Sequence, residues 1–405
     1  MELQLPNHPT PDHVPESLVQ AFPFIFGITT TKDPFNDLAA SIHKGPEIFY
    51  AKHAYPGASP AWIARRAEDL RHFYFDNEHF STKDFAPFSK LVGGNWGVWP
   101  VELDPPRHGS FRALVSHLFT PKAMSKLEDK IRQYAREYIE SFKEKGECEF
   151  MSEFAFEFPI KVFTELMGLP QEMTPTFLAW EMDLIHNHDM EKITQATHNV
   201  VNYLQGLIDD RRENPRDDLI SWAVNAELEG RPLTNDELIG FTFNLFIGGL
   251  DTVSTHMGLQ FLHLAKNPGD QQLLRENPDM LPAAIEELMR AYPAVTTFRT
   301  CIKTTQYKGI TFMPGDKIAM CTTLSGRDPE EYENANIIRF DRKPRHNSFG
   351  YGPHLCVGFH LARREMRIAM EEFLRLIPEF SLQEDYTVEY HLGMIQPVSL
   401  PLRWK

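Results

Sequence analysis

The sequence predicts a mainly α-helical fold with small β-sheets (α+β), and two observations on its texture support this. Helix-forming segments dominate from about residue 107 to residue 292. After residue 290 the chain becomes rich in β-branched residues and turn signals, in 295–305, 307–316, 317–324 and 388–402. No repeat, low-complexity tract or linker interrupts the 405 residues. We therefore expect one large domain, 1–405, with helices mostly in 107–292 and sheets mainly in 293–405.

The helices are recognised by their ends. The segment 125–146 has helix formers throughout and ends at Gly146. Further helices are predicted over 153–170 and 193–214. The longest predicted helix, 234–268, begins with a capping box from Thr234 to Glu237 and stops before Pro268. It would be about 48 Å long, enough to cross a domain.

This predicted long helix contains two helix-destabilising glycines near its centre. Gly248 and Gly249 each cost about 1 kcal/mol relative to alanine. Thr252 follows Gly248 by one turn, so its hydroxyl can bond the Gly248 carbonyl and bend the helix. One interpretation is a tight crossing of two helices, with Asp251 merely solvated. The other is space for a small ligand beside Gly248, with an acid and an alcohol placed for proton delivery.

Composition and charge exclude several classes of protein. Apolar residues make up 42% of the chain, and the net charge of −15 opposes binding to a phosphate backbone, so we expect no nucleic-acid partner. The segment 1–17 lacks a signal pattern, and the longest apolar stretch, 238–250, is shorter than the roughly 20 residues of a membrane span. The four cysteines show no Cys-x-x-Cys pair, which opposes a disulfide framework or a zinc site. We expect a soluble, cytoplasmic protein without a membrane partner, and a monomer.

One cysteine stands apart from the other three. Cys356 lies in a loop, 349–358, with glycines at 350, 352 and 358, just before a segment with helical spacing of apolar residues. Backbone N–H groups at a helix start stabilise a thiolate. A lone cysteine is usually inert core filler. The glycines instead indicate a backbone that turns tightly and approaches something flat and large.

This loop resembles the haem-thiolate loop of the cytochrome P450 monooxygenases. The family pattern Phe-x-x-Gly-x-His-x-Cys-x-Gly is filled by Phe349, Gly352, His354, Cys356 and Gly358. Three further segments stand in the family's order: 248–252 resembles the oxygen-activation stretch, 287–290 the Glu-x-x-Arg pair, and 340–342 the segment whose arginine joins that pair. The similarity runs from residue 11 to the end and is strongest to the bacterial class I branch, in particular the camphor 5-monooxygenase subfamily.

The resemblance implies a cytochrome P450 fold, bound haem b and hydroxylation with O2. It makes Cys356 the axial iron ligand and Asp251 and Thr252 the catalytic pair. Without the resemblance, a Glu-x-x-Arg pair is usually a surface salt bridge, and each cation an ordinary surface charge. The residues that the resemblance assigns to the haem are His108, Arg112, Arg299, His354, Phe349 and Gly248, and those of the core ion pair are Glu287, Arg290 and Arg342.

The expected substrate is a small hydrophobic terpenoid or norisoprenoid resembling an ionone. The stretch 95–103 resembles the edge of the family's pocket, and Trp96 stands where the camphor enzyme has the tyrosine that bonds its substrate. Trp96 offers one N–H donor, but its bulk and direction differ from those of a phenol. The residues assigned to the substrate by resemblance are Trp96, Val101, Asn244, Ile247 and Val295.

No flavin or nicotinamide motif occurs, so the electrons must come from another protein. The resemblance implies a two-iron–two-sulfur ferredoxin with its reductase. Because ferredoxins are acidic, we expect a basic patch from Arg71, Arg112, Lys343 and Arg363, although each could be an ordinary solvated charge. Two other classes remain open. A peroxide-driven haem-thiolate enzyme needs no ferredoxin, and a non-catalytic haem-binding sensor explains Cys356 but not Asp251 and Thr252.

Overall fold

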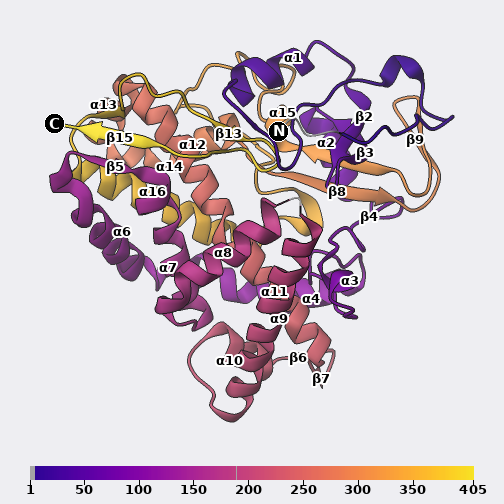
Figure 1. Ribbon diagram of the computed structural model, residues 1–405, viewed down its shortest axis with the longest axis horizontal. Helices are drawn as coiled ribbons and strands as arrows, with labels where there is room; N and C mark the ends of the chain where they lie inside the picture. The colour runs from indigo at the N-terminus through magenta and orange to yellow at the C-terminus, as the bar shows by residue number, and fades with distance from the viewer. Residues whose placement is uncertain (1–4, 188) are drawn as a thin grey trace.

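The computed structural model describes residues 5–187 and 189–405, and its helices follow the predicted division of the chain. Most of the longer helices lie between α4 (Arg107–Ser116) and α14 (Leu281–Ala291), with α2 (Ala67–Phe75) before them and one long helix after them. Figure 1 shows a triangular molecule with helices on the left and below and the main sheet at the upper right. The segments predicted as helices form α6 (Glu128–Phe142), α7 (Glu157–Met167) and α9 (Met190–Glu213), and α8 (Thr174–Ile185) lies between the last two.

The main sheet differs from the prediction, because most of its strands come from the N-terminal part of the chain. Its order is β2-β3-β11-β8-β4. The expectation that sheets come mainly from 293–405 is therefore wrong for this sheet. A turn at Pro56–Gly57, with a φ of +75° at the glycine, is the sequence signal that could have revealed the first hairpin. The strands are β2 (Ile48–Tyr55), β3 (Ser59–Ala64), β4 (Phe80–Ser81), β8 (Thr296–Cys301) and β11 (Lys317–Cys321).

Two small sheets return the C-terminal tail to the rest of the protein. One has the order β1-β13-β14 and the other β12-β15-β5. In the first, His391 of β13 pairs with Thr29 of the N-terminal strand β1, and Gln396 of β14 pairs with His391. These strands are β1 (Thr29–Thr30), β5 (Glu147–Glu149), β12 (Phe380–Leu382), β13 (Tyr390–His391), β14 (Gln396–Pro397) and β15 (Pro401–Trp404).

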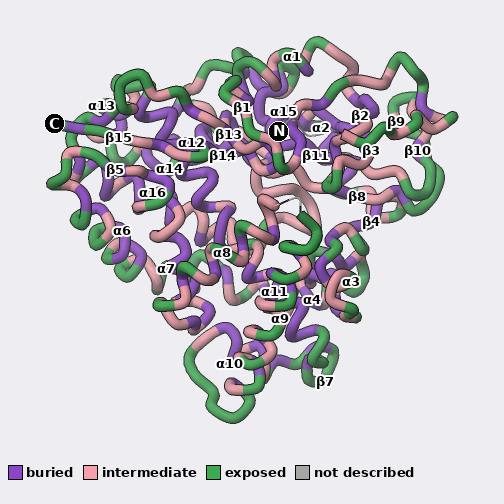
Figure 2. The backbone as a smooth tube through the Cα atoms, in the orientation of Figure 1, coloured by how far each residue is buried: buried purple, intermediate pink, exposed green. Residues whose placement is uncertain are grey.

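The predicted long helix forms, and it is interrupted at Asp251. It consists of α11 (Asn235–Leu250) and α12 (Thr252–Lys266), and the capping box from Thr234 to Glu237 is present. Its 32 residues are long and apolar enough to cross a membrane, but 72% of the most apolar window is buried inside the protein, as in a core helix. Figure 2 shows buried backbone concentrated around α12 and α14, and exposed backbone in the loop beside α10 (Leu219–Val224).

The last long helix, α16 (Phe359–Leu376), packs against α6 and α14. It also contacts α12, where Gln260 Nε2 donates to Met366 Sδ at 3.1 Å. The loop before α16 is thereby held on the same core as the interrupted helix, with α14 as a shared neighbour. The fold thus brings together the two segments that the sequence marks as chemically unusual.

Candidate active site

Cys356 differs from the other cysteines in its accessibility. It has exposed surface, whereas Cys148, Cys301 and Cys321 are buried. Its backbone N–H donates to the Phe349 carbonyl at 2.8 Å, which closes the loop. An accessible sulfur in a closed loop can bind a ligand, and the three buried cysteines cannot without rearrangement of the core.

The three glycines of this loop are not all required by the backbone conformation. Gly350 and Gly352 have φ values of +72° and +66°, a conformation that favours glycine, so the tight turn is explained. Gly358 has an ordinary φ of −84°, so the expectation that the turn needs it is wrong. A Cβ at Gly358 would meet no protein atom within 4 Å. The protein alone therefore does not require glycine at this position.

Cys356 precedes the N-terminus of α16, as predicted, because Gly358 is the N-cap. Desolvation by the surrounding protein raises the pKa of the Cys356 thiol, although the Gly358 N–H and the charges of Arg112 and Arg363 act to lower it. The Gly358 N–H at the helix start therefore favours the thiolate as expected, but the opposing effect of burial is larger. A coordinated metal ion deprotonates a thiol outright.

A cluster of nitrogen side chains lies next to this loop. The rings of His108 and His354 are 4.0 Å apart between centroids. Burial, followed by the charge of Arg299, lowers the pKa of His354 to about 2. Burial, followed by the charge of Arg112, lowers the pKa of His108 to about 4. The positive charges of Arg112 and Arg299 act on both imidazoles, and the same two charges would attract an anion.

Two atoms of this cluster have unmet hydrogen-bonding capacity. Nε of Arg299 and Nε2 of His354 are buried, and neither has a hydrogen-bond partner within the described residues. Buried donors without partners are uncommon because each costs roughly 1–3 kcal/mol. Burial lowers the pKa of Arg299 and of Arg112 as well. The four side chains fit a ligand that carries carboxylates.

The interrupted helix offers a line of accessible positions. Asn244, Ile247 and Gly248 are only partly buried or exposed, although most of α11 is buried, and their spacing places them on one face. A Cβ at Gly248 would meet open space, whereas one at Gly249 would lie 2.3 Å from Phe163 of α7. Both interpretations of the glycine pair therefore hold, one for each residue: Gly249 allows a tight helix crossing and Gly248 leaves space.

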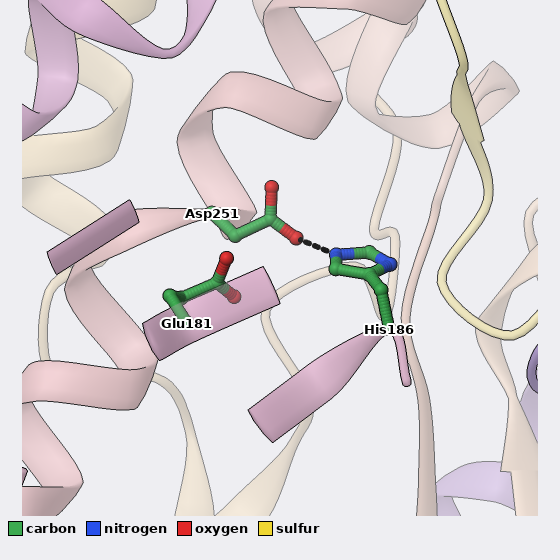
Figure 3. A group of neighbouring side chains, drawn as sticks. All are labelled: Glu181, His186 and Asp251. Atoms are coloured by element: carbon green, nitrogen blue, oxygen red, sulfur yellow. Dashed lines mark hydrogen bonds and ion pairs between the residues drawn. The ribbon is translucent and has the colours of Figure 1, made fainter. Parts of the chain in front are cut away.

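The predicted hydroxyl contact is present. Thr252 Oγ1 donates to the Gly248 carbonyl at 3.1 Å. Asp251 is 1% exposed, so the interpretation as a solvated carboxylate is wrong. Its Oδ2 lies 2.7 Å from Nε2 of His186, and Glu181 lies beside both residues (Figure 3). The sequence did not reveal these two residues, because no local pattern connects α8 with a carboxylate between α11 and α12.

The Glu-x-x-Arg pair forms a fully buried ion pair. Arg290 Nη2 donates to Glu287 Oε1 at 2.7 Å, and both side chains have no exposed surface. Arg342 Nε donates to the same carboxylate at 3.1 Å. Arg290 also donates to the carbonyls of Gly326 and Ala335. The pair is therefore a hub between α14 and the segment before the cysteine loop, not a surface salt bridge.

Comparison with known proteins identifies the family. The family model for cytochrome P450 matches residues 161–392. A probable cytochrome P450 127A1 of Sinorhizobium fredii is 37% identical over 405 residues, 98% of this chain and 97% of the relative. The chain belongs to the cytochrome P450 family. The crystal structures of CYP101J2 and CYP101C1 match with TM-scores of 0.87 and 0.86 at 29% and 32% identity, each over 98% of this chain and 100% of the other.

P450 enzymes are monooxygenases that bind haem b through a cysteine thiolate. The haem carries two propionate groups. The nitrogen cluster fits them, because two of its buried nitrogen atoms, on Arg299 and His354, have no hydrogen-bond partner among the described residues. The open spaces at Gly248 and Gly358 also suit a large flat group. The residues present in this P450 therefore fit the cofactor of the family.

The positions assigned to the substrate differ in their burial. Asn244 and Ile247 lie on the accessible face of α11, and Val295 is partly buried. Trp96 is only 7% exposed and packs against Phe243, 4.8 Å between ring centroids. The indole thus packs on Phe243, a residue of the same helix as Asn244 and Ile247. Val101 is 36% exposed.

The residues expected to form a basic patch are mostly paired. Arg71 Nη2 donates to Glu331 Oε2 at 2.6 Å, and Arg363 Nη2 donates to Glu286 Oε2 at 2.7 Å. Both arginines are thus paired with acidic neighbours, which reduces their contribution to a positive surface. Lys343 is exposed and forms no ion pair with any described residue.

Proposed function

We propose that this P450 binds haem b through Cys356 and hydroxylates a small hydrophobic molecule. The reaction consumes RH, O2, two electrons and two protons, and it yields ROH and water. One arrangement carries the proposal. An accessible cysteine lies beside a cluster of arginine and histidine nitrogens that can bind an anion. Thr252 bonds the carbonyl of Gly248, which borders open space, and the buried acid Asp251 directly precedes Thr252.

Each part of the chain has a defined task in this proposal. Haem b, when held by Cys356, supplies O2 reduction and C–H oxidation, and the thiolate favours O–O cleavage. His108, Arg112, Arg299 and His354 would bind the propionates. The Thr252 hydroxyl, beside open space, can hold a proton-carrying water, and buried Asp251 supplies it with protons.

The proposed electron donor is a two-iron–two-sulfur ferredoxin with its reductase. An acidic ferredoxin would meet Lys343 and the cations Arg71 and Arg363, which can exchange their carboxylate partners on docking. Exposed charge pairs are screened beyond about 8 Å at physiological ionic strength. We propose a monomer that works in the cytoplasm, where a diffusing ferredoxin reaches it.

With NADH, reductase and ferredoxin, we expect one hydroxylated product per O2 consumed, at a rate that falls as salt is added. Hydrogen peroxide alone should give at least about tenfold less product. Lys343→Glu should raise the KM for ferredoxin, and Lys192→Glu, at an exposed position of α9, should leave it unchanged. A peroxide-driven enzyme would show the opposite preference, and a sensor would form no product in either assay. A rate independent of salt would contradict the docking proposal.

We further propose that the substrate is a terpenoid or norisoprenoid resembling an ionone rather than camphor. Support comes from Ile247, which adds apolar surface to the accessible face of α11, and from Asn244, which can donate to a carbonyl there. The core position of Trp96 leaves camphor without the hydrogen bond of the camphor enzyme's tyrosine. A larger ring with an unsaturated side chain gains apolar contact at about 25 cal/mol per Å² buried.

Spin-state titration should show tighter binding of β-ionone than of camphor, followed by cleaner hydroxylation. Asn244→Leu should weaken β-ionone binding by about 2- to 12-fold, the range for one net hydrogen bond. Asn199→Leu, on α9, serves as the control with the same chemical change. Tighter binding and cleaner product with camphor would contradict the proposed substrate class.

A further inference from the structure

A cavity of about 390 Å³ lies on the C-terminal half of α12. Its other walls come from the short helix η2 (Pro34–Ala39), from Tyr292 at the end of α14 and from Tyr390 of β13. None of the residues assigned to the haem, the substrate or the electron donor lines it. Its first lining residue on α12, Leu259, is about 10 Å along the helix from Thr252. A volume of this size can hold a small organic molecule.

Arg327 brings a buried positive charge to this cavity. The residue is 3% exposed, and its guanidinium forms no ion pair with any described carboxylate. It donates instead to the Ala291 carbonyl at 2.8 Å and to the amide oxygens of Asn36 and Asn336 at 3.2 and 3.4 Å. The Tyr292 phenol is a fourth neutral acceptor. Because an arginine has five N–H donors, at least one is left for a ligand.

The other buried arginines among the described residues have partners that explain them. Arg290 and Arg211 each form an ion pair with a buried carboxylate. Arg65 uses all three of its side-chain nitrogens, on two backbone carbonyls and a neighbouring histidine. Arg299 is the parallel case, buried without an ion pair and proposed above to bind a haem propionate. By the same criterion, Arg327 fits an anion that the chain itself does not supply.

Two carboxylates also line the cavity, and both are engaged elsewhere. Asp33 Oδ1 caps η2 by accepting from two backbone N–H groups at 2.8 and 2.9 Å. Asp270 Oδ2 lies 2.8 Å from Nε2 of His263, whose Nδ1 lies 2.9 Å from the Tyr292 phenol. Burial raises the pKa of Tyr292 to about 12, so the phenol stays neutral. The two acids would repel a dianion such as phosphate more strongly than a monocarboxylate.

The remainder of the cavity suits an apolar body next to that single charge. The centre of the Phe35 ring lies 5.6 Å from Cζ of Arg327, so apolar surface borders the guanidinium. Lys266, exposed on the last turn of α12, forms no ion pair with a described residue and adds a second cation. The apolar side chains of the lining are Phe35, Leu259, Leu262 and Ile338.

We propose that this cavity binds an organic monocarboxylate, with its carboxylate on Arg327 and its apolar body against the leucines of α12. The proposal does not depend on the proposed reaction, because the cavity shares no residue with the haem or substrate positions. A bound ligand would contact η2, α12 and β13 together. It would therefore hold the N-terminal segment and the C-terminal tail on the core, and stabilise the folded protein as its concentration rises.

The test uses 2-naphthoate as the probe and its methyl ester as the neutral control, in calorimetric titrations of the haem-loaded protein. The ester should bind at least about tenfold more weakly than the acid, because it cannot form a charge-assisted hydrogen bond. Arg327→Gln should weaken binding of the acid by about 10- to 150-fold, the range for a hydrogen bond to a charged group. Equal affinities for acid and ester would overturn the proposal. Inorganic phosphate that binds as tightly as the acid would overturn the ligand class.

A second variant pair is independent of the buried hydrogen bonds of Arg327. Ile338→Trp narrows the cavity from a partly buried position and should weaken binding about fivefold or more. Ile337→Trp makes the same change at the adjacent position, which is 55% exposed and does not line this cavity, and should bind the acid as the unmodified protein does. Equal affinities of the two variants would contradict the assigned cavity.

Methyl resonances locate the probe in the unmodified protein. On addition of 2-naphthoate, the methyl signals of Leu262 and Ile338 should shift, while that of Ile247 and the haem absorption spectrum stay unchanged. A shift at Ile247 with a changed haem spectrum, and none at Leu262, would place the probe in the substrate site and overturn the proposal. None of these measurements uses product formation, so a failure of the proposed function would leave their outcome intact.

Discussion

Replacement of Cys356 by histidine should move the reduced carbon monoxide complex from the red-shifted band of a thiolate-ligated haem to the band typical of imidazole ligation. Turnover should fall at least on the order of 100-fold, because even the loss of an outer partner of a metal ligand costs about 10–100-fold. The thiolate also provides the electron density that favours O–O cleavage. Absorption spectroscopy of the reduced protein under carbon monoxide measures the first effect.

The matched control is Cys148→Ala. Cys148 is buried, and burial raises the pKa of its thiol above the usual range, so it is unsuited to bind iron. Its replacement should leave the carbon monoxide spectrum unchanged. An unaltered spectrum in Cys356→His, or a shifted one in Cys148→Ala, would contradict the proposal that Cys356 is the ligand.

Local signals in the sequence were sufficient to predict the helices. The capping box at Thr234 and Glu237 marks the start of α11, and Gly146 marks the end of the segment that contains α6, in a left-handed conformation. The main sheet was harder to predict, because β3 pairs in parallel with β11, with Trp62 opposite Ile318. Such a pairing joins segments that are distant in the sequence, and no local amino-acid pattern specifies it.

In the site, too, features set within one helix could be predicted, and features set by packing between distant segments could not. The spacing of Gly248 and Thr252 sufficed to predict their hydrogen bond, because both lie on one helix. The direction of Trp96 could not be predicted, because only the position of Phe243 on a distant helix decides that the indole packs into the core. His186 was missed for the same reason: it meets Asp251 through the crossing of α8 with α11.

The second large effect is expected at the buried ion pair. Glu287→Ala should lower the free energy of unfolding by about 3–5 kcal/mol, because it leaves Arg290 as an uncompensated buried charge. The loss extends to Arg342 and to the backbone N–H of Arg339, which both donate to the same carboxylate. Urea unfolding of the haem-loaded protein, followed by far-ultraviolet circular dichroism, measures the change.

An exposed pair with the same spacing provides the control. Asp209 and Arg212 on α9 are three residues apart and 2.8 Å from each other, but both are largely exposed. Asp209→Ala should cost only about 0.2–1 kcal/mol, because water solvates the remaining charge. The double replacement Glu287→Leu/Arg290→Leu should cost less than the sum of the single replacements, because it removes both buried charges together. If Glu287→Ala costs no more than Asp209→Ala, the ion pair is not the hub that joins α14 to the segment before the cysteine loop.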